Sequence, residues 1–498
     1  MSTEQHNERL RKVGELRARG VDPYPVGFRQ TAEAAELHAR FGELAAEAST
    51  GETVAVAGRL MGKRDLGKLS FGVLQDRSGR IQLFADQGTL GDELAAFVDL
   101  DLGDLIGVTG EVITTRKGEL SVRVHEFGLL AKSLWPLPEK WHGLADVETR
   151  YRQRYLDLIA NEEARRVFGV RAGVLRGLRR AFEDRGYVEV ETPVLQNQAG
   201  GALATPFLTH HNALDIDMYL RIALELHLKR LIIGGIDKVF EIGRVFRNEG
   251  VSPQHNPEFT MLESYEAYAD YDDIMRLVEE TVSGVAAAVT GSNRVEYQGR
   301  PLDLAPPWRR APFMDLINEA TGREWDPDMA VDEARAAARD LGVEVEVGGT
   351  GKVLEELFER FVEPNLWEPT FVVDFPKEIS PFARDHRSKP GLVERFEGFL
   401  AGIEFCNAFT ELNDPEEQLR RFEVQAQARA QGDEEAHVTD LDFVRAMEYG
   451  MPPTGGLGIG VDRLAMILAD VGTLREVILF PHMRPEEADP AILEDPAD

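Results

Sequence analysis

The chain has 498 residues, of which 43% are hydrophobic and 29% charged, a composition typical of a globular protein of about three domains. Its formal net charge of −31 argues against a broadly basic nucleic-acid-binding surface, although net charge governs solubility and steering rather than local sites. One cysteine excludes an internal disulfide, and the sequence shows neither an apolar leader nor a run of about 18 apolar residues, so we expect a cytoplasmic protein with no membrane partner.

Two helical segments are expected first, at residues 5–20 and about 31–48. From residue 53 to 132 the hydrophobic pattern changes to a period of two, and this stretch predicts a five-stranded barrel such as an OB-fold. Residues 55–80 are locally basic, with six arginines and lysines against two aspartates. The expected strands cover residues 54–60, 71–76, 81–85, 105–113 and 120–124.

The C-terminal two thirds of the chain mix helices and strands without a regular βαβ alternation, which predicts an α+β domain on a largely antiparallel sheet. The expected organisation has five parts. They are a helical extension (1–52), the barrel (53–132), a proline-punctuated linker (133–160), the α+β domain (161–485) and an acidic tail (486–498).

Several common sites have no signature in this sequence. It contains no P-loop, no cysteine pair for zinc and no recognisable nucleophile triad, and His210–His211 has no spaced partner that would favour a metal site. A covalent or zinc-dependent mechanism is therefore not indicated.

Residues 239–250 and 259–268 are expected to form two strands joined by a long loop. Side chains two positions apart share a face of a strand, so each strand presents one polar face with aromatic residues. Such a face suits a ligand-binding surface, and a solvated outer face is the alternative. The residues concerned are Glu241, Arg247 and Glu249 in the first strand, and Phe259, Met261, Glu263 and Tyr265 in the second.

Glu225 lies in an apolar run, residues 222–226, that is expected to be strand-like. Acids are rarely buried unless they are paired, so Glu225 is either part of a ligand site or paired with Lys229 or Arg230. From the residues alone both alternatives stay open.

Residues 404–414 form a second candidate polar strand. Asn407 and Glu411 share strand parity and Glu404 does not, so a bulge is needed if all three serve one site.

The glycine-rich run 455–460 leads into an amphipathic helix that carries Arg463 in its first turn. Alternating glycines let another group approach a strand backbone closely. A cation at a helix N-terminus opposes the helix dipole, which indicates a bound anion, with tight strand–helix packing as the alternative.

These segments resemble the three motifs of class II aminoacyl-tRNA synthetases, whose first motif lies at a dimer interface, and the class I motifs are absent. Further segments make the likeness closest to the bacterial lysyl-tRNA synthetase family, over residues 5–485. Motif 1 resembles residues 188–193, motif 2 resembles 246–249 with 255–260, and motif 3 resembles 458–463; the further segments are 150–159, 209–215, 219–223 and 410–414.

The resemblance implies a two-step reaction. Lysine is first activated with ATP to lysyl-adenylate and pyrophosphate, and it is then transferred to the 3′-terminal ribose of tRNA(Lys). The lysine carboxylate is the attacking group, which agrees with the lack of a protein nucleophile. The partners implied are tRNA(Lys), lysine, ATP, Mg²⁺ and a second copy of the chain, with no DNA.

Site residues follow from the resemblance position by position. Arg247 would hold the α-phosphate, Arg463 would lie by the adenine and γ-phosphate, and Phe259 would stack on the adenine. The implied sets are Arg247, Glu249, His255, Asn256, Phe259 and Arg463 for ATP, of which Arg247 and Arg463 are catalytic; Gly201, Glu225, Glu263, Tyr265, Asn407 and Glu411 for lysine; Glu397 and Glu404 for magnesium; and Lys63, Arg64, Phe71, Gln82 and Glu119 for the anticodon.

Departures from the family pattern lie near the expected lysine site. Thr205 stands where an arginine is common, Leu224 where a proline is usual, His227 where a tyrosine is usual, and Cys406 and Ala408 where glycines are usual. Three alternatives stay open. They are an aspartate or asparagine ligase, a paralogue that attaches lysine to a protein, and a catalytically inactive RNA-binding protein. The paired acids Glu225 and Glu411 favour lysine over aspartate, and the barrel argues against the protein-modifying paralogue.

Overall fold

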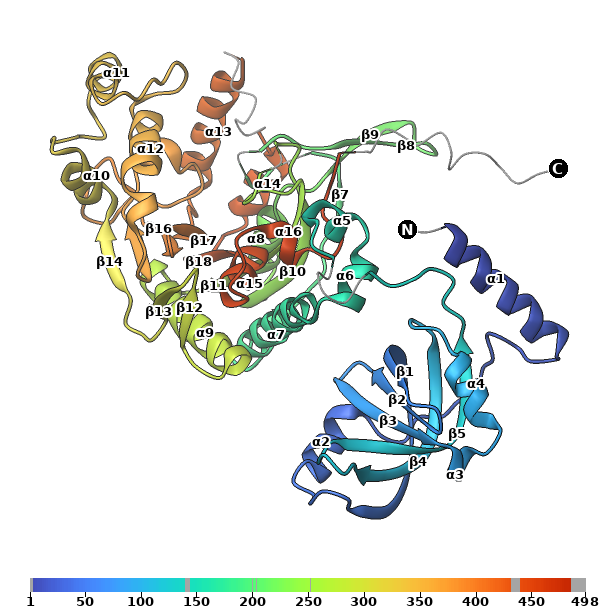
Figure 1. Ribbon diagram of the computed structural model, residues 1–498. Coiled ribbons are helices and arrows are strands. Elements are labelled where there is room, and N and C mark those ends of the chain that lie inside the picture. Colours follow the sequence, from blue (N-terminus) through green and yellow to red (C-terminus); the bar gives the residue numbers. More distant parts are fainter. Residues whose placement is uncertain are drawn as a thin grey trace. The chain divides into compact units, whose positions relative to one another are not determined.

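A computed structural model describes residues 3–138, 144–198, 200–202, 204–250, 252–430 and 439–484 (Figure 1). The chain divides into two compact units, Met1–Ala145 and Asp146–Asp498. The expected acidic tail, 486–498, lies outside the described residues, and the finer division into five parts stays a prediction. Among the described residues, no helix has the length and apolar character needed to cross a membrane.

The first unit contains a closed five-stranded barrel in the order β1-β2-β3-β5-β4, as the alternating sequence predicted. Inward-facing aliphatic side chains, such as Leu60, Leu83 and Val122, are fully buried and alternate with outward-facing ones. The elements are α1 (Thr3–Ala18), α2 (Ala34–Phe41), β1 (Ser49–Asp65), β2 (Leu69–Gln75), β3 (Arg80–Asp86), α3 (Gln87–Leu90), α4 (Glu93–Asp99), β4 (Leu105–Thr114) and β5 (Leu120–Ala131).

Two details of this unit differ from the expectation. The second helix is shorter than 31–48, because Gly42 ends α2 and the chain turns into β1 at Ser49. Between the third and fourth strands, where no helix was expected, residues 86–103 contain the short helices α3 and α4, and Asp86 caps the first of them by accepting a hydrogen bond from the Thr89 N–H.

The second unit is built on an eight-stranded sheet in the order β14-β15-β16-β17-β18-β11-β10-β6. The β14–β15 and β10–β6 pairs are parallel and the other pairs are antiparallel, which confirms the predicted α+β class. The strands are β6 (Val188–Glu189), β10 (Lys238–Phe246), β11 (Glu258–Ala267), β14 (Arg309–Pro312), β15 (Thr370–Val373), β16 (Arg395–Leu400), β17 (Ile403–Thr410) and β18 (Thr454–Gly460).

Two smaller sheets accompany it. They consist of β7 (Leu195–Gln196), β8 (Leu208–His211) and β9 (Ile216–Leu220), and of β12 (Arg294–Tyr297) with β13 (Arg300–Asp303).

The main sheet is covered differently on its two faces (Figure 1). Helices α7 (Glu162–Glu183), α9 (Tyr271–Thr290) and α15 (Val461–Leu468) pack on one face, where Leu178, Val278 and Leu464 form one core with Leu262 of β11. Glu263 and Tyr265 follow Leu262 with opposite parity and face away from that core. The second face is therefore available for a site.

The remaining helices are mostly short. They are α5 (Val147–Arg152), α6 (Arg154–Ala160), α7 (Glu162–Glu183), α8 (Glu225–Ile233), α9 (Tyr271–Thr290), α10 (Phe313–Thr321), α11 (Val331–Asp340), α12 (Thr350–Phe361), η1 (Glu363–Asn365), η2 (Lys377–Ile379), α13 (Pro415–Ala430), α14 (Leu441–Glu448), α15 (Val461–Leu468) and α16 (Leu474–Val477).

The expectation of a strand at residues 222–226 was wrong, because α8 begins at Glu225. A short buried apolar run has the same appearance in a strand and in the first turn of a buried helix, so periodicity could not separate the two.

Candidate active site

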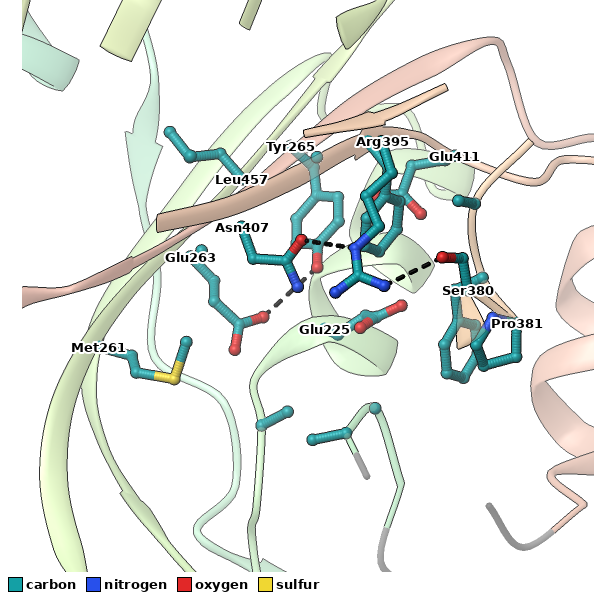
Figure 2. Close-up of a pocket in the computed structure, with 18 of the residues that line it drawn as sticks. Glu225, Met261, Glu263, Tyr265, Ser380, Pro381, Arg395, Asn407, Glu411 and Leu457 are labelled. Carbon is teal, nitrogen blue, oxygen red and sulfur yellow. Dashed lines mark hydrogen bonds between the residues drawn. The ribbon is translucent and has the colours of Figure 1, made fainter. Parts of the chain in front are cut away.

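A cavity of about 220 Å³ lies on the second face of the main sheet, bordered by β11, β17, β18 and the start of α8 (Figure 2). All six residues expected to bind lysine line it, although they come from four separate stretches of the chain. These residues are Gly201, Glu225, Glu263, Tyr265, Asn407 and Glu411. The structure brings the set together, and the role of each residue stays a prediction.

Two buried acids mark one side of this cavity. Glu225, in the first turn of α8, is 6% exposed, and Glu411, just after β17, is 1% exposed. The Lys229 ammonium forms ion pairs with both carboxylates. Burial raises the pKa of Glu225 and of Glu411 above the usual range, and Lys229 opposes that shift. The ion pair to Lys229 anticipated from the sequence is therefore present, and it coexists with a place at the cavity.

One oxygen of this acid pair has no hydrogen-bond donor. Glu411 Oε1 is buried without a hydrogen-bond partner among the described residues, and it lies against Gly456 so closely that a Cβ there would overlap it. The glycine run of β18 thus admits a carboxylate, as its spacing predicted. A buried carboxylate oxygen without a donor is costly, and a cationic ligand would satisfy it.

A third acid, Glu263, lies on β11 at the same cavity. The Leu224 backbone N–H donates to its Oε1 at 2.9 Å, and the Tyr265 hydroxyl donates to its Oε2 at 3.3 Å. Burial raises the pKa of Glu263 to about 7, partly offset by the Leu224 hydrogen bond. This carboxyl therefore changes charge near neutral pH.

Arg395 is a cavity residue that the sequence analysis missed. Its guanidinium donates to Asn407 Oδ1 at 3.1 Å and to Ser380 Oγ at 2.9 Å (Figure 2). It also donates to Glu397 Oε1 at 2.6 Å. Arg395 lies two residues before Glu397 and therefore on the same face of the strand, and this spacing could have indicated it. Arg395 connects the cavity to the expected metal ligand.

A second cavity, of about 330 Å³, adjoins the first. Arg247, Met261, Asn407 and Gly458 line both. All residues expected to bind ATP line the second cavity: Arg247, Glu249, His255, Asn256, Phe259 and Arg463. An amino acid and a nucleotide bound in the two cavities would be neighbours.

The guanidiniums of Arg247 and Arg463 in the second cavity each contact a neighbouring residue. The Arg247 guanidinium lies 5.2 Å from the centre of the half-buried Phe259 ring. Arg463, in the first turn of α15, forms an ion pair with Glu404, and its guanidinium also donates to the Glu404 backbone carbonyl at 2.7 Å. These two cations face a cavity that also carries an aromatic ring, which suits a nucleotide triphosphate.

The buried residue beside Arg463 fixes the turn that presents it. Asp462 accepts a hydrogen bond from the Thr260 N–H at 3.0 Å and forms an ion pair with Arg171 of α7. The start of α15 is thereby attached to β11.

The expected metal ligands lie on adjacent strands, Glu397 on β16 and Glu404 on β17. A bulge at Phe405 interrupts the register of β16 and β17, because Gly398 pairs with Cys406 whereas Phe399 pairs with Glu404. This is the bulge that the parity of Glu404 required. Burial raises the pKa of Glu397 to about 8, with Arg395 opposing and Glu404 reinforcing the shift. Among the described residues, no three His, Cys, Asp or Glu side chains converge as a metal site.

In the first unit, β2 and β3 place Phe71 directly opposite Phe84, with ring centres 5.5 Å apart. Arg123 of β5 lies over the Phe84 ring at 5.7 Å. Neither Phe84 nor Arg123 was predicted as a site residue, although the alternation of β3 indicates that Phe84 faces outward. Gln82 accepts a hydrogen bond from Ser121 Oγ at 2.9 Å.

The other expected anticodon residues differ in their surroundings. Arg64 and Glu119 are exposed. The Lys63 ammonium instead donates to the Val98 and Leu100 carbonyls, the latter at 2.7 Å, and burial lowers its pKa. In this conformation Lys63 is bound to the end of α4.

None of the five departures from the family pattern lines the first cavity. His227 lines a different one, and Cys406 and Ala408 face the core against α9 and α15. Leu224 has a more direct effect, because its N–H bonds to Glu263 and the proline usual in the family has no such donor.

Comparison with known proteins places this geometry in a family. Residues 146–484 match the model of class II tRNA synthetases (D, K and N), and residues 54–130 match that of the OB-fold nucleic acid binding domain. The chain belongs to the lysine–tRNA ligases of class II.

The relatives share nearly the whole chain. A lysine–tRNA ligase of Moorella thermoacetica is 53% identical over 481 residues, covering 96% of this chain and 97% of its own length. One of Synechococcus sp. strain CC9311 is 53% identical over 489 residues, covering 97% and 100%. One of Carboxydothermus hydrogenoformans is 53% identical over 481 residues, covering 96% and 98%. Family membership thus confirms the resemblance and the predicted ligase class.

Proposed function

We propose that this chain activates lysine with ATP, forming lysyl-adenylate and pyrophosphate, and then transfers lysine to the 3′-terminal ribose of tRNA(Lys). The observation that carries the choice of lysine is the acid pair, Glu225 and Glu411, with an oxygen of Glu411 that lacks a donor. Each charge-assisted hydrogen bond to a substrate ε-ammonium contributes about 1.5–3 kcal/mol. An aspartate or asparagine side chain offers no cation to this pair.

The protein supplies position and charge rather than a nucleophile. The lysine carboxylate attacks the α-phosphate, so the residues must align two substrates and stabilise charge on the phosphates. Arg247 lines both cavities, which supports a role in binding the α-phosphate where they join. Arg463 would bind the γ-phosphate side, with Phe259 stacking on the adenine and Glu249, His255 and Asn256 orienting the nucleotide.

Magnesium fits the donor set at Glu397 and Glu404. The charge of Glu404 contributes to the raised pKa of Glu397, about 8. A bound dication would offset the repulsion between these two carboxylates. Oxygen ligands together with phosphates are what Mg²⁺ prefers, and the bound ion would supply charge neutralisation on the phosphates.

The barrel is the proposed anticodon-binding domain. Single-stranded RNA loops are commonly recognised by stacking on aromatic side chains, and Phe71 is half-buried on the barrel surface beside Phe84. Gln82 and Glu119 would contact base edges, and Arg64 the backbone. Lys63 would contact the RNA backbone only after its ammonium releases the carbonyls of Val98 and Leu100.

We also propose that the active form is a cytoplasmic homodimer. The β8–β9 hairpin exposes Leu208 and Ile216, and β6 and β7 expose Val188 and Leu195. Exposed apolar residues gathered on one part of a protein are typical of an interface, and two-fold dimers are the commonest oligomers.

ATP–pyrophosphate exchange tests the proposal. With Mg²⁺ and without tRNA, each of the twenty amino acids is supplied in turn, and we expect exchange with lysine alone. Arg463→Ala should abolish exchange while tRNA binding is retained. Exchange with aspartate or asparagine, or full exchange in Arg463→Ala, would contradict the assignment. Charging of tRNA(Lys) by the wild-type chain then tests the acceptor.

A further inference from the structure

A buried cation lies behind the acid pair of the lysine cavity. Lys229 is 1% exposed, and its ammonium contacts the carboxylates of both Glu225 and Glu411. Both acids line the cavity and Lys229 does not. Each carboxylate therefore has Lys229 on one side and the cavity on the other.

The surroundings of Lys229 add no other full charge at contact distance among the described residues. Its ammonium lies 4.8 Å from the centre of the Phe382 ring, 5.5 Å from that of Phe409, and 5.9 Å from those of Tyr265 and Phe443. Glu263 of β11 has its own donors in the Leu224 N–H and the Tyr265 hydroxyl. The group in direct contact with Lys229 thus consists of two carboxylates and one ammonium. Glu263, Arg247 and Arg395 also line the cavity, outside this contact group.

These three groups sum to one negative charge. Two close carboxylates without a cation do not both ionise, because like charges disfavour each other, and such a pair retains a proton. An ammonium between the two carboxylates lets both of them ionise without a retained proton, and it cancels one of their two negative charges. What remains is balanced by one positive charge from the cavity side.

We propose that Lys229 is a positioning residue that sets the substrate charge: it keeps Glu225 and Glu411 both ionised and cancels one of their charges, so the cavity takes a side chain with a single positive charge. This inference rests on the proposed function, and it explains why a site for a monocation contains two acids.

A charge cycle tests the proposal, with lysine and its neutral isostere norleucine as probes in ATP–pyrophosphate exchange. Glu225→Gln leaves Glu411 neutralised by Lys229, so we expect the KM for lysine to rise about 10- to 100-fold and discrimination against norleucine to fall. Glu225→Gln with Lys229→Met restores one negative charge, so we expect the KM to fall about tenfold from that of Glu225→Gln. The kcat should stay within about threefold across the cycle.

The rescue separates the proposed role from a structural one. If Lys229 only supports packing, the double variant binds lysine as poorly as Glu225→Gln or worse, and the proposal is overturned. Lys238→Met is the matched control, because Lys238 pairs with Glu266 away from the cavity. It should neither change the KM nor rescue Glu225→Gln.

Folding is checked by thermal unfolding of each variant. If the Glu225→Gln double variant does not fold, Glu411→Gln with and without Lys229→Met gives the same comparison, with lysine binding measured by equilibrium dialysis. Lysine-dependent exchange by the wild type together with no rescue in either pair overturns the role of Lys229 alone. No lysine-dependent exchange by the wild type would contradict the proposed function itself.

Discussion

At the scale of single residues, the absence of a side chain at Gly456 lets the Glu411 carboxylate lie close to the backbone of β18. A Cβ at Gly456 would overlap Glu411 Oε1 and approach the Tyr265 ring. A Cβ at Gly458 would approach the flexible end of Met261 at 3.2 Å and would make only ordinary van der Waals contacts with Asn407 O and Glu263 Cγ. We therefore expect Gly456→Ala to raise the KM for lysine at least tenfold and Gly458→Ala to change it by less than threefold. Steady-state exchange kinetics measure both. Equal effects of the two alanines would contradict the close approach to Glu411.

The charge of Glu263 makes lysine binding depend on pH. Its pKa is raised to about 7 by burial, and a substrate ammonium favours the ionised form, so binding lowers that pKa. Lysine affinity should therefore fall as the pH drops below about 7. The kcat/KM for lysine, measured from pH 5.5 to 8.5, should show this acid limb.

Leu224→Pro provides a matched variant for that pH profile. Proline removes the N–H that donates to Glu263 Oε1, and this hydrogen bond lowers the pKa of the carboxyl. The acid limb should move to higher pH in Leu224→Pro. An unchanged midpoint, or one that moves down, would show that Glu263 is not the group that titrates.

Residues and spacing predicted the faces of the strands at the site, whereas the sets of ligand-binding residues came from the family resemblance. Strand parity correctly indicated that Glu263 and Tyr265 share a face, and it required the bulge that the structure places at Phe405. The partners supplied by distant segments could not be predicted this way. The Glu225–Lys229 pair, four residues apart, was anticipated, but the ion pair of Lys229 with Glu411 and the hydrogen bond of Arg395 to Asn407 form only when separate elements meet, which no local pattern encodes.

At the scale of elements, β2 and β3 of the barrel combine a stacking surface with a stable core. Phe71 and Phe84 are outward-facing, while Leu74 and Leu83 of the same strands are buried. Phe71→Ala should weaken tRNA(Lys) binding by about 1–3 kcal/mol, the contribution of one stacked base, and leave ATP–pyrophosphate exchange unchanged. Filter binding and exchange measure the two effects.

The control for Phe71 is Phe41→Ala, which removes an aromatic ring of α2 in the same unit. We expect it to leave tRNA affinity near that of the wild type. If both alanines weaken binding equally, Phe71 acts through the stability of the barrel rather than by stacking.

The barrel strands and the β10–β11 hairpin were predictable because each is a local alternation of apolar and polar residues bounded by turns. Residues 222–226 were not, because a run of five residues, four of them apolar, is too short to separate a strand from the start of a helix. The elements that sequence resolves best are therefore those with the longest periodic patterns.

At the scale of the whole molecule, the net charge of −31 was a poor guide to the proposed RNA partner, because the locally basic stretch 55–80 belongs to one barrel of a much longer chain. The exposed hairpin β8–β9 is a more specific guide to a protein partner. Leu208 is 68% exposed and Leu214 63%, and large apolar side chains exposed together on a hairpin are typical of a surface that another protein covers.

We therefore expect the wild-type chain to sediment with twice the mass of one chain, and Leu208→Lys to shift it toward the monomer, because a charge buried at the interface is costly. Val347→Lys replaces a residue that is 63% exposed elsewhere in the second unit, and it should leave the dimer intact. Analytical ultracentrifugation over a range of concentrations distinguishes these outcomes. A wild-type monomer at all concentrations would contradict the dimer, and a dimer that persists in Leu208→Lys would place the interface away from β8.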